Sequence, residues 1–306
     1  MIRRKIVMRV LVANLLLLIF PDIFGCCNPQ VNNQVKITGY DLANPDKILT
    51  LPAILHEISG LTEIDSTSFA CIQDENGILF IYDVIKNQIR YQYIFHSDGD
   101  YEGITRVGAI FYVLRSDGVL FEISDYQTGK PKVISYYSGI PAQDDEGLCY
   151  DHKNGRLLIA CKEEIDKSRI EKDRRLIYGF DPESKKSTAQ PVITLDLPLI
   201  RQFAVSNKIG LTGKSKKKGG RTRPDIQLKI SDLAIHPLTG KLFVLSAADY
   251  LLFIFDLNGT IEHIEKLNPV LFNKPEGITF LENGDLLISN EGQKGKPTLL
   301  IYKYQN

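Results

Sequence analysis

The stretch DDEGLCYDHKNGRLLIACKE, residues 144–163, places an acid and a glycine before two apolar runs that flank an Asn-Gly turn. The stretch KPEGITFLENGDLLISNEG, residues 274–292, repeats this order. Short apolar runs around an Asn-Gly pair are typical of a β-hairpin, because Asn and Gly tolerate the positive φ that such turns need. A hairpin explains the strands, but it does not explain why a glutamate precedes the glycine both times.

Related units recur along the chain. The position of the glutamate is held by Ser59, Glu102, Glu146, Ser231 and Glu276, at steps of 43, 44, 85 and 45 residues. The step of 85 corresponds to one unit plus an insertion of about 40 residues. Second strands are expected at residues 69–72, 111–114, 157–160, 242–245 and 286–289, with third strands near residues 79, 120, 176, 252 and 299. A fourth, weaker strand is expected near residues 90, 131, 191 and 261.

Four-stranded units of this length, repeated about a centre, make a β-propeller. The fifth unit lacks a fourth strand because the chain stops at Asn306, whereas KILTLPA at residues 47–53 has strand character and no unit of its own. We therefore predict an all-β fold, a five-bladed β-propeller closed by an N-terminal strand, in preference to six blades.

The runs EISGLT, DYEGIT, DDEGLCYD, LAIHPLTGKLFVLS and KPEGITFLENGDLLISNEG follow in order from about Leu51 to the C-terminus. In these runs the chain resembles the SdiA-regulated family of bacterial propellers, which are distantly similar to NHL-repeat propellers. The resemblance implies a five-bladed propeller with a bound calcium ion, often exported, and no established biochemical activity. The basic run KSKKKGGRTR at residues 214–223 is not part of the family pattern.

The first 25 residues have the order of a secretory signal, with a basic start, an apolar run and a lipoprotein box that ends Gly25-Cys26. We predict a signal peptide over residues 1–25, lipidation of Cys26, a lipid-anchored linker over residues 26–45 and a propeller over residues 46–306. A plain signal or an anchor helix is the alternative, although the apolar run is shorter than the ~20 residues that span a bilayer. The expected location is the cell envelope, periplasmic or facing the outer membrane.

The charge of the chain excludes one class of partner. Its 37 basic and 37 acidic residues include four basic residues and one acidic residue within residues 1–25, which leaves 33 against 36. Such a near-neutral surface gives no reason to expect nucleic acid as a partner. Within the predicted propeller, an insertion at about residues 199–229 holds the basic run KSKKKGGRTR, whose composition cannot pack a core.

Cys149 and Cys161 flank the Asn154-Gly155 turn almost symmetrically. They are expected on neighbouring strands, either as a disulfide in an oxidising compartment or as two buried thiols. The cysteine and histidine spacings do not match a zinc site.

The recurring glutamate has a function if several blades each contribute an oxygen to one ion. In a propeller, the start of the first strand and the end of the second meet at one mouth of the central channel. The candidate metal ligands there are Glu102, Glu146, Glu276, Glu57, Glu163, Asn290 and Glu291. Carboxylates so close repel one another, and calcium, which accepts six to eight oxygens, removes the conflict. The alternative is that each glutamate caps a strand and faces water.

These features favour a calcium-binding, membrane-tethered binding module whose channel mouth recognises a small molecule, a glycan or a protein. The alternative is a metal-dependent hydrolase of a lactone or an ester, because a calcium ion can act as a Lewis acid. The chain has no GxSxG, phosphate-loop or HExxH motif, so we assign no catalytic residue, and His56 is the one neutral base near the mouth. A third possibility is that calcium merely holds the blades together.

Overall fold

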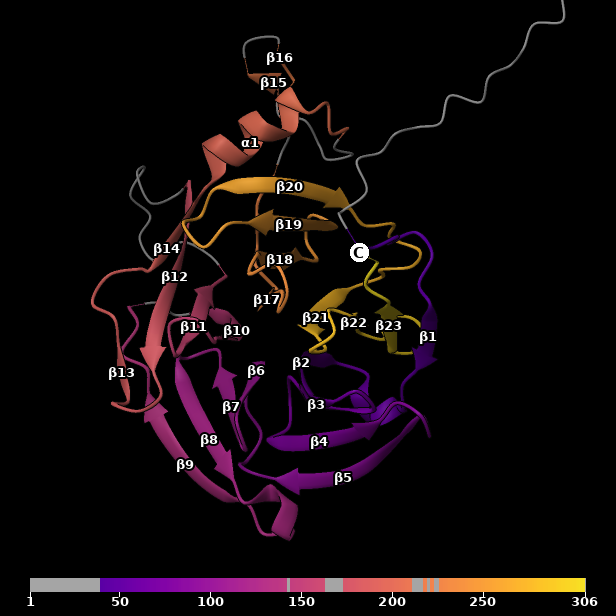
Figure 1. Cartoon of the computed structure of the whole chain (residues 1–306), viewed down its shortest axis with the longest axis vertical. Coiled ribbons are helices and arrows are strands. Elements are labelled where there is room, and N and C mark those ends of the chain that lie inside the picture. The colour runs from indigo at the N-terminus through magenta and orange to yellow at the C-terminus, as the bar shows by residue number, and fades with distance from the viewer. Residues whose placement is uncertain are drawn as a thin grey trace, which may run out of the picture. The chain divides into compact units, whose positions relative to one another are not determined.

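The computed structural model describes residues 39–141, 144–162, 173–210, 217–218, 221–222 and 226–305. The signal peptide, Cys26, Glu163 and most of the basic run lie outside these residues, so their predictions stay untested. Five small antiparallel sheets form a ring around a centre (Figure 1). The predicted five-bladed β-propeller is confirmed.

Each blade is an antiparallel sheet that begins at the centre of the ring. Blade 1 consists of β2 (Ile58–Asp65), β3 (Ser68–Gln73), β4 (Ile78–Asp83) and β5 (Gln88–Ile94), and blade 2 of β6 (Tyr101–Val107), β7 (Ile110–Arg115), β8 (Val119–Ser124) and β9 (Lys132–Tyr137). Blade 3 consists of β10 (Asp145–Asp151), β11 (Arg156–Cys161), β12 (Arg174–Asp181), β13 (Lys186–Ser187) and β14 (Ile193–Asp196). Blade 4 consists of β17 (Asp232–Ile235), β18 (Leu242–Ser246), β19 (Leu251–Phe255) and β20 (Ile261–Lys266).

Blade 5 closes the ring with strands from both ends of the described chain. It contains β21 (Pro275–Phe280), β22 (Leu286–Asn290) and β23 (Thr298–Tyr302), and its outer strand is β1 (Lys47–Thr50). β1 pairs with β23 in a register that runs from Lys47 opposite Ile301 to Thr50 opposite Thr298. The N-terminal strand therefore supplies the fourth strand that the last unit lacks, as the sequence predicts.

The hydrophobic core is divided among the interfaces between blades. Each of five clusters of buried side chains joins two neighbouring blades, including blade 5 to blade 1 across the closure. This arrangement follows from the strands, because side chains alternate between the two faces of a sheet and each face of a blade packs on a neighbour. The inner strands β2, β6, β10, β17 and β21 contact one another in ring order.

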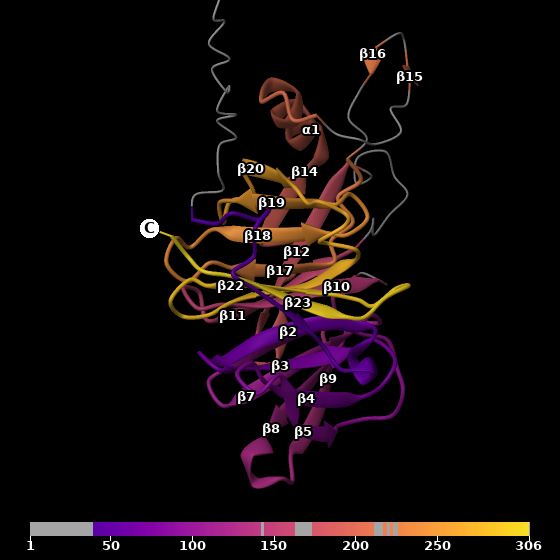
Figure 2. The same cartoon turned by 90° about the vertical axis from the view of Figure 1, so that its right-hand side faces the viewer.

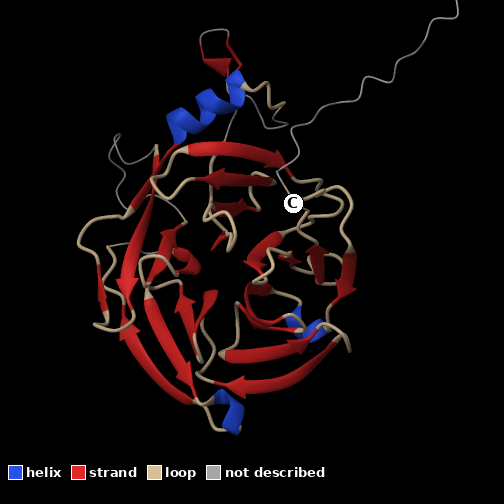
Figure 3. Cartoon of the chain, viewed as in Figure 1, coloured by secondary structure: helices blue, strands red, loops and turns tan. Residues whose placement is uncertain are grey.

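One α-helix and two short 3-10 helices, η1 (Ala53–Leu55) and η2 (Tyr126–Thr128), accompany the strands in the described part of the chain (Figure 3). α1 (Leu197–Ser206) follows β14, and the side chain of Asp196 accepts a hydrogen bond from the backbone N–H of Leu199, which caps its first turn. α1 lies beside β14 and β20, and Figure 2 shows it beyond the outer strand of blade 4. Ile200 and Ala204 are buried in the cluster between blades 3 and 4.

The sequence analysis did not predict α1, because the basic run dominated the composition of the insertion. Residues on both sides of that run do pack: Ile226, Leu228 and Ile230 join the same cluster as α1. The two-residue strands β15 (Lys217–Lys218) and β16 (Arg221–Thr222) pair with each other. No helix in the described part of the chain is both long enough and apolar enough to cross a bilayer.

Candidate binding site at the channel mouth

The recurring glutamates occupy β-bulges at the starts of inner strands. In β6, Tyr101 pairs with Arg115 and Gly103 pairs with Leu114, so Glu102 is the extra residue between two paired positions. The register shifts at the same place in β10 and β21, around Glu146 and Glu276. A bulge bends its strand and changes the direction of a side chain, and bulges are frequent next to functional sites. The glutamate column therefore coincides with a bend in each of these three inner strands.

The glycine after each glutamate is required by the close approach of neighbouring inner strands. A Cβ atom on Gly103 would lie 2.7 Å from the Cβ of Leu148 in the next blade. A Cβ on Gly147 would lie 2.4 Å from Cδ2 of Leu233, and one on Gly277 would lie 2.6 Å from Cδ2 of Leu61. Real Cβ atoms essentially never approach heavy atoms within 3.0 Å. The Glu-Gly pair thus combines a glutamate at a β-bulge with a glycine whose position has no room for a Cβ atom.

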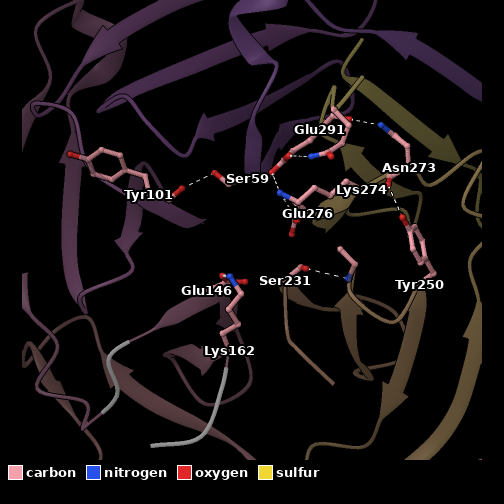
Figure 4. A network of polar contacts seen from close by, with 12 residues as sticks. Ser59, Tyr101, Glu146, Lys162, Ser231, Tyr250, Asn273, Lys274, Glu276 and Glu291 are labelled. Atoms are coloured by element: carbon pink, nitrogen blue, oxygen red, sulfur yellow. Dashed lines mark hydrogen bonds and ion pairs between the residues drawn. The ribbon is translucent and has the colours of Figure 1, made fainter. Parts of the chain in front are cut away.

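The three glutamates line one cavity of about 380 Å³, which we call the acidic mouth. Figure 4 shows Glu146 and Glu276 there, each beside a lysine. Its lining comes from strand-one starts, strand-two ends and the loops beside them: Ser59, Asp74, Glu102, Glu146, Lys162, Lys229, Ser231, Ala247, Ala248, Lys274, Glu276 and Glu291. The structure therefore brings four of the predicted ligands together, namely Glu102, Glu146, Glu276 and Glu291. It also adds Asp74, at the end of a second strand.

Lysines pair with the glutamates of the acidic mouth. Lys162 forms an ion pair with Glu146, whose side chain is almost fully buried. The Nζ atom of Lys274 lies 2.5 Å from Oε1 of Glu291 and 3.2 Å from Oε1 of Glu276. The sequence analysis missed both lysines, although they stand in the quoted stretches as Cys-Lys-Glu and Lys-Pro-Glu-Gly. These ammonium groups partly neutralise the carboxylates, which the sequence analysis expected a metal ion to do.

Two of the predicted ligands lie away from the cavity lining. Asn290 is fully buried, and its side-chain amide donates hydrogen bonds to Thr298 Oγ1 at 3.1 Å and to the Leu271 carbonyl at 3.3 Å. Glu57 is a neighbour of Asp74, and the backbone carbonyl of Glu57 accepts a hydrogen bond from the backbone N–H of Asp74. The backbone carbonyl of His56 accepts from the Gly292 N–H, and its ring covers that glycine. His56 therefore does not line the mouth as a base.

Two carboxyl pairs at the mouth hold protons. The side chain of Asp74 lies within hydrogen-bond reach of Glu57, and burial together with the charges of Glu57 and Glu291 raises the pKa of Asp74 to about 7. Burial and the neighbouring Asp100 raise the pKa of Glu102 to about 8. Ionising both members of a pair of neighbouring carboxyl groups is unfavourable, because the two negative charges repel each other. One member of each pair therefore keeps its proton near neutral pH.

The acidic mouth has the donor chemistry for a hard cation, although its oxygens do not surround one point. Five carboxyl groups and three ammonium groups line it, so carboxyl groups outnumber ammonium groups by two. The Oδ1 atom of Asp74 is buried without a hydrogen-bond partner. Among the described residues, however, no group of three or more His, Cys, Asp or Glu side chains stands close enough to hold a metal ion.

Blade 4 departs from the Glu-Gly pattern in a way that the sequence analysis did not interpret. Ser231 and Asp232 stand where the other blades have serine or glutamate followed by glycine. Asp232 is buried, and its Oδ2 accepts a hydrogen bond from the backbone N–H of Ile278 in blade 5 at 2.9 Å. Its Oδ1 is buried without a partner, and burial raises the pKa of this carboxyl well above its usual range.

Comparison with known proteins supports the fold. The chain is similar to the crystal structure of glutaminyl cyclase from Myxococcus xanthus, with a TM-score of 0.56 and 15% identity over 86% of this chain and 97% of that one. It is more distantly similar to virginiamycin B lyase from Staphylococcus aureus, with a TM-score of 0.42 and 13% identity over 83% of this chain and 73% of that one. The ring of five antiparallel sheets defines the chain as a five-bladed β-propeller protein.

No family model matches the sequence, and no curated protein matches it significantly. The resemblance to the SdiA-regulated family therefore stays a prediction.

Proposed function

We propose that this protein is a binding module of the cell envelope, tethered through a lipid on Cys26, whose acidic mouth binds calcium. The calcium site would in turn present a surface to a small molecule, a glycan or a protein. The observation that carries the proposal is the convergence of bulged glutamates from blades 2, 3 and 5 on one cavity that holds two more carboxyl groups than ammonium groups. Metal binding at propeller mouths is also what the family resemblance implies.

Calcium would be held by Glu102, Glu146 and Glu276, with Asp74 and Glu291 at the edge of the same cavity. Bound there, the ion would supply positive charge and open coordination positions for ligand oxygens. Glu102 and Asp74 already face the cavity without a lysine partner in the part of the chain that the structure describes. Lys162 and Lys274 are partly exposed, so they can move outward when a stronger cation replaces them.

A thermal titration with calcium tests the proposal. Calcium should raise the melting temperature, since a ligand that binds the folded state alone stabilises it by about 2.7 kcal/mol at a hundred times its dissociation constant. Glu102→Gln removes one carboxylate from the mouth and should weaken this response. The matched control is Glu183→Gln, in the exposed turn between β12 and β13. Magnesium, which dehydrates reluctantly, should substitute poorly.

An equal calcium response in wild type and Glu102→Gln would mean that the ion binds elsewhere. The absence of any response would mean that the lysines already neutralise the mouth and that its ligand is not a metal ion. Unfolding of the whole domain by a chelator would instead favour calcium as a structural element that holds the blades together.

A second function is favoured by Glu102. A buried carboxyl group with a pKa of about 8, open to a cavity, has the property expected of a general acid or base. A hydrolase of lactones or esters is therefore the alternative proposal, with Glu102 in the place that the sequence analysis considered for His56. The test is hydrolysis of a panel of nitrophenyl esters and lactones. Activity in the wild type that Glu102→Gln abolishes would support an enzyme over a binding module.

A further inference from the structure

The central channel is closed by a ring of aliphatic side chains. Each inner strand contributes one residue, two positions after the serine or glutamate of the mouth: Leu61, Ile104, Leu148, Leu233 and Ile278. All are 2% exposed or less. The cavities on the two sides of this ring share no lining residue. Whatever binds at the acidic mouth is therefore separated from the opposite end of the channel.

A larger cavity, of about 830 Å³, lies on the other side of the ring, and we call it the opposite mouth. The aliphatic ring is its floor, so the floor is entirely apolar. Tyr150, Ile235 and Phe280 continue along the inner strands into its wall. Its volume falls within the 300–1,000 Å³ range that is usual for small-molecule pockets.

The wall of the opposite mouth contains an arginine that its neighbours hold in one position. Nε of Arg106 donates to the Glu63 carbonyl at 2.9 Å, Nη1 donates to the Gly108 carbonyl at 2.8 Å, and Nη2 lies 3.1 Å from Oε1 of Glu63. Oε2 of Glu63 in turn accepts from Thr62 Oγ1 at 3.2 Å. A guanidinium has five N–H groups, so two remain for a ligand. The charge of Arg106 is already balanced by Glu63, so Arg106 offers a ligand hydrogen-bond donors but no unpaired charge.

Several other charges of this mouth are paired within the protein, whereas Lys153 and Glu282, which form no ion pair among the described residues, are exposed to solvent. Asp151 pairs with Arg156 at 3.0 Å, and Lys241 forms an ion pair with Glu262. Asp256 accepts backbone hydrogen bonds from its own turn, which hold the pKa of this carboxyl below its usual range. The lining therefore offers apolar surface and hydrogen-bond donors, in contrast to the acidic mouth with its excess of carboxylates.

We propose that the opposite mouth binds a small, uncharged and largely apolar molecule with a hydrogen-bond acceptor. Its apolar body would rest on the aliphatic floor beside Tyr150 and Phe280, and its acceptor would take the two unused N–H groups of Arg106. A charged ligand is disfavoured because it would lose its water above an apolar floor, whereas the charges of this mouth that lack an ion pair, Lys153 and Glu282, are exposed and stay hydrated. This site does not depend on the calcium proposal, because the aliphatic ring separates the two mouths.

The experiment uses the absence of tryptophan from the chain. Tyr150→Trp places a single indole in the wall of the opposite mouth, and Tyr91→Trp places one on the exposed outer strand β5. The neutral apolar dye 6-propionyl-2-dimethylaminonaphthalene carries a ketone as hydrogen-bond acceptor and absorbs where tryptophan emits. Saturable quenching with one dye per protein is expected for Tyr150→Trp, together with much weaker quenching for Tyr91→Trp. Equal quenching in the two variants would overturn the proposal, because the dye would then bind the surface at large.

A charge variant tests the same site without relying on the new indole. Ile235→Lys adds a charge to a half-buried position of the wall and should weaken dye binding about tenfold, since an apolar ligand then faces a desolvated ammonium group. The matched control is Ile94→Lys, at a position that is 78% exposed on β5. Circular dichroism would verify that both variants fold. Unchanged dye affinity in a folded Ile235→Lys would refute the site.

The two mouths can also be told apart. Glu102→Gln and added calcium should leave dye binding at the opposite mouth unchanged. A dye response that follows Glu102→Gln and ignores Ile235→Lys would place the apolar ligand at the acidic mouth, and that result would contradict this proposal.

Discussion

Replacing Gly103 with alanine tests why a glycine follows the glutamate at the start of an inner strand. The added Cβ would lie 2.7 Å from the Cβ of Leu148 and 3.0 Å from the carbonyl oxygen of Glu146, whereas ordinary contact begins at 3.4 Å. Neither neighbour can rotate away, because one is a Cβ atom and the other belongs to the backbone. Strand β10 would therefore have to move away from β6.

The size of the effect follows from two opposing terms. Overpacking of this kind costs about 1–3 kcal/mol. The loss of glycine's freedom in the unfolded chain offsets about 0.4–1 kcal/mol of that cost. We expect a net loss of about 1–2 kcal/mol, and each kcal/mol should lower the melting temperature by about 2–4 °C for a domain of this size.

The assay is urea unfolding of wild type, Gly103→Ala and a matched control, Gly210→Ala. A Cβ on Gly210 would have no heavy atom of the described residues within 4 Å, and the φ of Gly210 lies outside the left-handed range that disfavours other residues. The control should match wild type or exceed it slightly. If the two variants are equally stable, crowding between inner strands is not the reason for the glycine.

Three other predictions concern the core, the thiols and the anchor. Asp232→Asn should stabilise the protein increasingly as pH rises above about 4, because burial raises the pKa of Asp232 and the folded state keeps a proton that the unfolded chain releases. Urea unfolding at several pH values checks this, and a difference that does not vary with pH would contradict it. Cys71, Cys149 and Cys161 are buried free thiols, so mapped alkylation should label them in the unfolded protein alone; labelling under native conditions would show the burial to be wrong. Cys26→Ala should release the protein from the detergent phase or leave an unprocessed precursor, and an unmodified mature N-terminus at another residue would refute the anchor.

The sequence by itself determined the strands, their repetition and the closure of the ring. These features are local, because alternation, turn residues and unit length act over a few positions of the chain. The missing strand of the last unit and the surplus strand at residues 47–53 were enough to predict the pairing of β1 with β23. The glutamate column was also visible, since an acid at a constant position in three units stands out against variable loops.

The tertiary structure decided what the glutamates contact. The β10–β11 and β21–β22 hairpins place Lys162 and Lys274 beside glutamates of their own blades, and only the ring brings these ion pairs into one cavity with Glu102. The closed channel, the burial of Asp232 and the position of Arg106 likewise depend on distances between blades, which no periodicity within one strand encodes. The sequence analysis missed α1 because neighbouring basic residues dominate the composition of that segment. Burial against blades 3 and 4 stabilises the helix. The local pattern of apolar residues and turns determines the strands of each blade. The chemistry of each mouth depends instead on side chains from different blades that meet at the axis.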